Sequence, residues 1–171
     1  NALAITANLQ KANLKVIEPF MKGIFSNIEG TLSGIYTITG ALARPELKGE
    51  GEIDGGKLTV DYLKTTYQLE GIIGLRQDAI YFKDVQLTDL LRNKGKLNGE
   101  VRHVNFGQMS IDMAATFENF QLLNTSARDN SLFYGQGFAT GDVSFTGPLN
   151  NLKITANAAT RKNTRVSIPI A

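Results

Sequence analysis

The chain has 171 residues, 42% of them hydrophobic and 20% charged, and its formal net charge is +2. This composition excludes a disordered chain, and the near balance of charges provides no concentrated basic face for nucleic acid. The absence of Cys excludes disulfides, thiolate metal sites and Cys nucleophiles. We treat residues 1–171 as a single domain. Because the sequence starts abruptly and stops just after a strand-like run, we expect it to be a fragment of a larger protein.

The first segments predict a strand followed by one helix. Leu3, Ile5, Ala7 and Leu9 alternate with small or polar residues, which is the period of a strand. Apolar residues then recur at steps of three and four, which is helical spacing. Since Pro19 is tolerated in a first helical turn, we expect a short helix from about Glu18 to about Phe25.

From Gly30 onward the pattern is that of strands punctuated by Gly and Pro. Gly55-Gly56 is a hairpin turn signal between the second and third of these strands. Apolar and polar residues alternate along these strands, which gives each strand one buried and one wet face, as is typical of antiparallel sheets. Strands of parallel α/β folds would be continuously apolar, and such strands are missing. We therefore predict an all-β, antiparallel-rich fold. Its strands are expected at Thr31–Ala43, Leu47–Asp54, Leu58–Tyr62, Thr66–Gly74, Ala79–Thr88, Gly95–Phe106, Met109–Glu118, Gln136–Thr146, Leu152–Thr160 and Arg165–Ile170.

A weak internal repeat suggests that the sheet is built from similar units. The run from Gly34 to Gly40 resembles the run from Gly141 to Gly147, and Gly95–Val101 is a looser third copy. Strands repeated side by side predict an elongated sheet that can extend beyond either end of this piece.

We find no catalytic constellation, and we predict a protein that is not an enzyme and has no metal or cofactor. The single His, His103, shares the parity of Leu97 and Val101, so we expect it to face inward. Glu50, Glu52 and Asp54 alternate on the polar side of a strand and are interpreted as a solvated face. Gly135-x-Gly137-x-x-x-Gly141 lacks the following helix that a dinucleotide loop needs.

The apolar faces of the strands are the candidate functional feature. Such a face is either the closed core of a sandwich or barrel, or a partly open groove that accepts an acyl chain, and periodicity does not separate the two. The candidate groove residues are Leu32, Tyr36, Ile38, Leu42, Ile53, Leu58, Val60, Leu97, Val101, Met109, Ile111, Met113, Phe117, Val143, Phe145 and Ile154.

Several short runs of the sequence resemble the C-terminal domain of TamB-like proteins. They are Gly30–Gly34, Pro45–Gly49, Phe133–Gly137, Gly141–Pro148 and Asn163–Pro169, within a resemblance that spans about Leu3 to Ile170. TamB-like proteins belong to the AsmA-like group, and the resemblance implies a long sheet curled into a U-shaped trough, the β-taco, with an apolar interior.

The resemblance also implies a cellular setting. It places the chain in the periplasm of a Gram-negative bacterium, as part of a protein anchored in the inner membrane. The implied partners are a BamA-like outer-membrane barrel protein and either phospholipid or nascent outer-membrane β-strands. The implied roles are outer-membrane protein assembly and phospholipid transport between membranes. The alternative is a structural scaffold with a closed core that docks an outer-membrane barrel partner.

Overall fold

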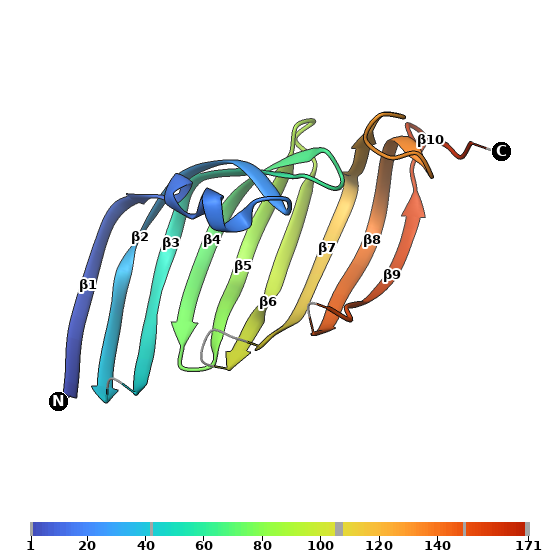
Figure 1. Cartoon of the computed structure of the whole chain (residues 1–171). Helices are drawn as coiled ribbons and strands as arrows, with labels where there is room; N and C mark the ends of the chain where they lie inside the picture. The colour runs from blue at the N-terminus through green and yellow to red at the C-terminus, as the bar shows by residue number, and fades with distance from the viewer. Residues whose placement is uncertain (1, 42, 105–107, 149, 170–171) are drawn as a thin grey trace.

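The strands form one open antiparallel sheet (Figure 1). The computed structural model describes residues 2–41, 43–104, 108–148 and 150–169, and its described residues contain ten strands in a single sheet. From β1 to β8 each strand pairs with its neighbour in sequence, while β8 also pairs with both β9 and β10. The all-β, antiparallel prediction is therefore confirmed.

The elements follow one another with short connections. They are β1 (Ala2–Asn13), the 3₁₀ helix η1 (Leu14–Met21), β2 (Phe25–Ala41), β3 (Arg44–Val60), β4 (Thr65–Arg76), β5 (Ala79–Asp89), β6 (Lys94–Val104), β7 (Gln108–Thr125), β8 (Tyr134–Pro148), β9 (Lys153–Thr160) and β10 (Arg165–Ser167). None of the described helical segments has the length and hydropathy of a membrane span.

The connections divide between the two ends of the strands. Residues 14–24, 61–64, 90–93, 126–133 and 161–164 lie at the end that carries η1, at the top of Figure 1, and we call this the η1 end. The last residues of β2, β4, β6 and β8 and the first residues of β3, β5, β7 and β9 lie at the opposite end.

The predicted α-helical segment differs from the structure in type and in bounds. It is a 3₁₀ helix at Leu14–Met21, and Phe25, expected at its end, begins β2. The side-chain oxygen of Asn13 accepts a hydrogen bond from the backbone N–H of Lys15 at 2.9 Å and caps the start. Pro19 lies inside the segment, where its ring and missing N–H disfavour α-helical hydrogen bonding.

One irregularity recurs in the hairpins β1–β2, β3–β4, β5–β6 and β7–β8. In each, two residues of the first strand face a single polar residue of the second strand, and a glycine follows that polar residue. The facing dipeptides are Ser33-Gly34, Glu70-Gly71, Asn98-Gly99 and Thr140-Gly141. Since a β-bulge bends its strand and increases the twist, every one of these hairpins is bent.

The bulges have a common backbone conformation. Their second residues have positive φ, and they are Lys11, Gly55, Asp84 and Asn119, with φ of 53°, 59°, 51° and 50°. Three of these residues donate their backbone N–H to the facing side chain. The acceptors are Ser33 Oγ at 3.0 Å, Asn98 Oδ1 at 2.8 Å and Thr140 Oγ1 at 2.8 Å.

This hairpin unit corrects two sequence predictions. Gly55 and Gly56 lie in the bulge inside the single strand β3, so they are not a hairpin turn. The repeat is real, but its third copy aligns on Gly99 rather than on Gly95, because Gly99 occupies the position of Gly34 and Gly141 beside the bulge.

Candidate functional site

Apolar side chains line up across the sheet on one of its faces. Residues that pair directly across antiparallel strands point to the same side. One such row runs from β2 to β7, and a second runs from β4 to β9. The first row is Tyr36, Gly49, Leu75, Ile80, Val101 and Ile111, and the second is Ile73, Phe82, Gly99, Met113, Phe145 and Ile154. We call the side that these rows occupy the apolar face.

The pairing brings the predicted groove residues together. All of those that the structure describes lie on the apolar face, distributed over β2, β3, β6, β7, β8 and β9. Leu42 lies outside the described residues. The alternation in the sequence therefore identified one continuous surface, although it does not show what that surface binds.

Much of the apolar face is only half-buried. Ile80, Phe82, Val101, Ile111 and Met113 occupy its centre and keep intermediate exposure. Met109 is 37% exposed and Ile154, on the β9 edge, is 60% exposed. The described strands all belong to one sheet, so no second sheet among them packs on this face. A single sheet covers its own apolar side only where it curls onto itself, so the exposed part of this face has no second layer of described strands over it.

Sequence reasoning missed the contribution of β4 and β5 to this face. Leu69, Ile73 and Leu75 alternate along β4, and this signal was available in the sequence. In β5 the bulge at Asp84 shifts the alternation, so that Ile80 and Phe82 before it share a face with Val85 and Leu87 after it. A strict period of two cannot reveal that arrangement.

Tyr36 fills space that neighbouring glycines leave. It is buried, and its hydroxyl donates to the backbone carbonyl of Ile73 at 2.9 Å. To reach β4 it crosses β3 at Gly49 and Gly51, where an added Cβ would clash with the Tyr36 side chain. These glycines therefore serve the packing of the protein's own side chain.

At the η1 end the apolar face is closed by a small core. Tyr67 of β4 and Phe120 of β7 stack with ring centroids 4.9 Å apart, although β5 and β6 separate their strands in the sheet order. Strands three spacings apart in a flat sheet would lie about 14 Å apart, so the sheet is strongly curled here. The cluster consists of Tyr67, Phe117, Phe120 and Ala139, with Val60, Leu87, Leu122 and Val143 packed against it.

Hydrogen bonds hold this closure in place. The hydroxyl of Tyr67 donates to the carbonyl of Gln121 at 2.7 Å, and the backbone N–H of Asn124 donates to the carbonyl of Leu63 at 2.9 Å. Burial raises the pKa of Tyr67 to about 12, since the charged phenolate is disfavoured away from water. The link from β4 to β7 closes the apolar face where the β5–β6 hairpin ends.

Asp89 joins the β5–β6 turn to β7. Its carboxylate is buried, and Oδ1 accepts from the backbone N–H groups of Leu91 and Asn93 at 2.9 Å and 2.8 Å. The other oxygen accepts from the Asn93 side chain at 2.9 Å and from the backbone N–H of Gln121 at 3.0 Å. A buried carboxylate with these donors fixes both segments.

The opposite side of the sheet is polar. Glu50, Glu52 and Asp54 are exposed there, as the sequence predicted. Tyr81 lies over Gly74 and donates to Glu50 Oε1 at 2.6 Å, which raises the pKa of Tyr81 to about 12. His103 is buried on the apolar face, so its predicted inward orientation is confirmed.

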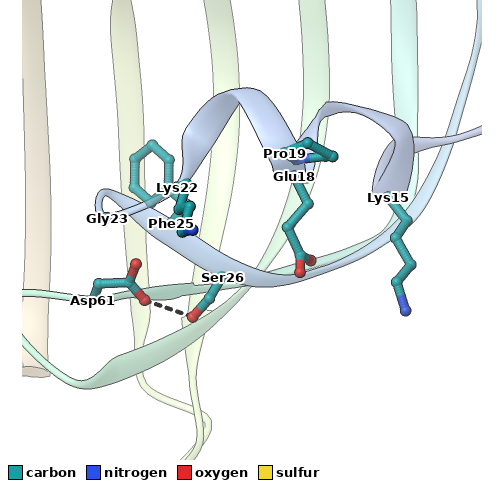
Figure 2. A pocket seen from close by; sticks show the side chains of 8 residues that line it. All are labelled: Lys15, Glu18, Pro19, Lys22, Gly23, Phe25, Ser26 and Asp61. Carbon is teal, nitrogen blue, oxygen red and sulfur yellow. Dashed lines mark hydrogen bonds between the residues drawn. The ribbon is translucent and has the colours of Figure 1, made fainter.

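A pocket of about 370 Å³ lies beside η1 (Figure 2). It is lined by Lys15, Glu18, Pro19, Lys22, Gly23, Phe25, Ser26 and Asp61. Both of its carboxylates already hold donors of the protein. Asp61 accepts from the Ser26 hydroxyl at 2.5 Å, and Glu18 accepts from the backbone N–H of Ile28 at 2.8 Å. The single His lies near the far end of β6, so Ser26 has no histidine base beside it.

Comparison with known protein families identifies a matching domain. The model of the TamB C-terminal domain matches residues 83–170, which extend from β5 to the residues after β10. No curated protein and no solved structure matches the chain. The match covers more than half of the residues, and the repeated hairpin unit continues through the part before it. The chain belongs to the TamB C-terminal domain family.

Proposed function

We propose that the half-buried part of the apolar face is a trough that holds the acyl chains of phospholipid or a nascent outer-membrane β-strand. The TamB family points to a non-enzymatic role in outer-membrane protein assembly or transport in the envelope of Gram-negative bacteria. In our proposal this chain is a periplasmic section of an inner-membrane-anchored β-taco, and it works with a BamA-like barrel protein.

The observation that carries the proposal is the exposure of the central rows. Ile80, Val101 and Ile111 pair across three strands, yet each keeps intermediate exposure. Burying a methylene group contributes about 0.8 kcal/mol, so an acyl chain laid along these rows would be held without polar contacts. A non-directional surface of this kind suits a lipid mixture whose chains differ in length.

The closed end supports a particular placement of the occupant. Tyr67 and Phe120 fill the apolar face at the η1 end, so Val60, Phe117 and Val143 of the predicted set belong to a core. The proposed trough therefore comprises the half-buried and exposed residues of the remaining rows, from Leu32 and Ile38 in β2 to Phe145 and Ile154 at the β9 side. Its occupant would run across the strands.

A nascent strand is the second occupant that specific features favour. Both edges of the sheet are exposed, and every residue of β9 has high exposure. Edge strands offer unpaired backbone groups for strand addition. A photo-crosslinking residue at Thr6 in β1 or at Thr155 in β9 should capture an outer-membrane barrel precursor if strands are the cargo.

The alternative function is a structural scaffold with a closed core that docks the barrel partner. The Tyr67–Phe120 cluster favours it, because that region is packed as a core. The two functions differ in what the rest of the face does. A scaffold needs the rows only for rigidity, whereas a trough needs them free for an occupant.

A matched pair of variants separates these functions. Met113 and Ala114 are adjacent on β7 but point to opposite faces. Met113→Asp should abolish the lipid that native mass spectrometry detects on protein purified from cells, whereas Ala114→Asp should retain it. Ile38→Asp provides a second test on β2. Circular dichroism must show that the variants are folded, because an unpaired charge in a closed core is costly. A wild-type protein that is consistently empty would favour the scaffold.

A further inference from the structure

Exposed apolar side chains gather at the η1 end. Val16 in η1, Tyr62 in the β3–β4 turn and Leu90 in the β5–β6 turn are 70%, 67% and 64% exposed. Ile24 and Leu91 are also exposed, and so is Leu132 before β8. Each of these residues lies in a connection and none belongs to the apolar face. The connections that carry them lie along one end of the sheet (Figure 1).

Cations outnumber acids at this end. Its cations are exposed: Lys15, Lys22, Lys64, Arg92, Lys94, Arg128, Arg161, Lys162 and Arg165. Its acids bind donors of the protein instead. Glu18 and Asp61 accept from Ile28 and Ser26, Asp89 is buried, and Asp129 accepts from the backbone and hydroxyl of Ser126. Nine cations against these four acids give the η1 end a net positive charge, with Lys64 placed 4.0 Å from Asp129, although the whole chain is nearly neutral.

The opposite end differs in its described residues. Its exposed Arg76 and Arg102 form ion pairs with Asp78 and Glu100. Its exposed large apolar side chains, Val104, Met109 and Ile154, belong to strands rather than to connections. Among the residues that the structure describes, exposed apolar side chains in connections that also carry Lys and Arg are therefore concentrated at the η1 end. Leu and Tyr side chains enter the boundary between headgroups and acyl chains, while Lys and Arg attract anionic lipid.

We propose that the η1 end docks on the surface of an anionic phospholipid bilayer, with its turn tips inserted into the headgroup region. Charge complementarity identifies this partner, because the exposed cations match anionic headgroups and the apolar tips match the layer beneath. The docking is separate from the trough function, since the tips and the apolar face share no residues.

Vesicle sedimentation tests the docking with the whole chain. The wild-type protein should sediment with vesicles of phosphatidylcholine and phosphatidylglycerol, and high salt should weaken the binding. The variant Leu90→Ser/Leu91→Ser should bind at least about tenfold more weakly. Its turn should persist, because the Asp89 carboxylate accepts from the backbone N–H groups of the turn and the two Leu side chains make no such bond. Ile35→Ser is the matched control, since Ile35 is exposed on the polar face.

The cations require their own variant. Lys15→Gln/Lys22→Gln/Lys162→Gln should lose binding to the anionic vesicles, whereas Lys48→Gln on the polar face should not. Equal sedimentation with vesicles of phosphatidylcholine alone would overturn the electrostatic part of the proposal. Wild-type protein that does not sediment at low salt, or that forms dimers dependent on Leu90 and Leu91, would overturn the docking altogether.

A tryptophan reporter locates the contact. The chain has no Trp, so Tyr62→Trp introduces a single Trp at the η1 end, whose emission can be excited separately from that of Tyr. Its emission should shift to the blue on adding anionic vesicles, and lipids with quenchers near the headgroup should quench it. Ile35→Trp should do neither. If the protein sediments with the vesicles but the fluorescence emission from position 62 neither shifts nor is quenched, the lipid contact lies on another surface and the proposal is overturned. Acyl-chain retention by native mass spectrometry should remain unchanged in the Leu90 and Leu91 variant.

Discussion

The backbone N–H of Asn119 donates a hydrogen bond to the hydroxyl of Thr140, 2.8 Å away on the neighbouring strand. Asn119 is the positive-φ residue of the β7 bulge, and the Thr140 hydroxyl also accepts from Arg161 Nε at 2.8 Å. Equivalent bonds join Lys11 to Ser33 and Asp84 to Asn98. A polar side chain on the second strand therefore fixes the bend of the first.

Replacing Thr140 by Val tests the importance of this hydrogen bond. The change keeps the β-branched shape and removes the acceptor, so we expect the free energy of unfolding to fall by about 1–2 kcal/mol. Urea denaturation measures the loss. Thr116→Val is the control, because Thr116 is exposed on the same face of the sheet, in the neighbouring strand β7. Equal effects of the two changes would show that the bulge does not depend on its acceptor.

Replacing Gly99 by Ala tests the other half of the repeated unit. A Cβ at Gly99 would clash with the backbone of β7 at Asp112 and Met113, and its φ of 137° is strained for other residues. We expect a loss of roughly 2–4 kcal/mol or a failure to fold. Gly95→Ala should cost less, because its φ is ordinary and its nearest neighbour would be 3.1 Å away. A milder effect at Gly99 than at Gly95 would contradict this account.

Regular alternation made most of the strands predictable, whereas the bulges did not. Met109, Ile111 and Met113 keep a strict period of two, and their common face is confirmed. β7 nevertheless continues past Glu118 to Thr125, because the bulge at Asn119 shifts the period without ending the strand. A bulge and a turn use the same residue types, so Gly55-Gly56 predicted a turn where the strand only bends.

The closed end of the apolar face was beyond sequence reasoning. Tyr67 and Phe120 belong to strands that are not neighbours, and their contact depends on how far the β5–β6 hairpin extends and how sharply the sheet curls. Periodicity assigns each side chain to a face but gives no curvature. The predicted groove set therefore included Phe117 and Val143, which pack in the core, alongside residues that remain half-buried.

The pKa of Tyr67 predicts a loss of stability at alkaline pH. Burial raises this pKa from 10.0 to about 12, so the native state favours the neutral phenol. The resulting stabilisation is complete below about pH 10 and is lost as the pH rises through about 12. Tyr67→Phe should flatten this decline and lower stability near neutral pH by about 1 kcal/mol, because the bond to Gln121 is lost.

Urea unfolding at about pH 8 and about pH 11 checks this prediction. Tyr62→Phe is the control, because Tyr62 is exposed in the β3–β4 turn. Part of the decline should remain in Tyr67→Phe, since the hydrogen bond to Glu50 also raises the pKa of Tyr81 to about 12. An alkaline decline that is identical in wild type and Tyr67→Phe would mean that Tyr67 ionises as freely in the native state as in the unfolded chain.

Two phenylalanines on the apolar face distinguish a core from a trough. Phe120 is 2% exposed in the closed end, whereas Phe145 is half-buried in the row that ends at Ile154. Phe120→Ala should lower the free energy of unfolding by about 3–5 kcal/mol, because it leaves a cavity in a packed cluster. Phe145→Ala should cost about 1 kcal/mol, since much of its surface already meets solvent.

Lipid retention completes the comparison. Phe145→Ala should reduce the lipid that native mass spectrometry finds on the folded protein, because it removes apolar surface from the proposed trough. Phe120→Ala, studied at a low temperature where it stays folded, should retain its lipid. If both changes cost equal stability and neither alters lipid retention, the apolar face is a core along its whole length. The scaffold function would then account for the rows of Ile, Val and Met side chains.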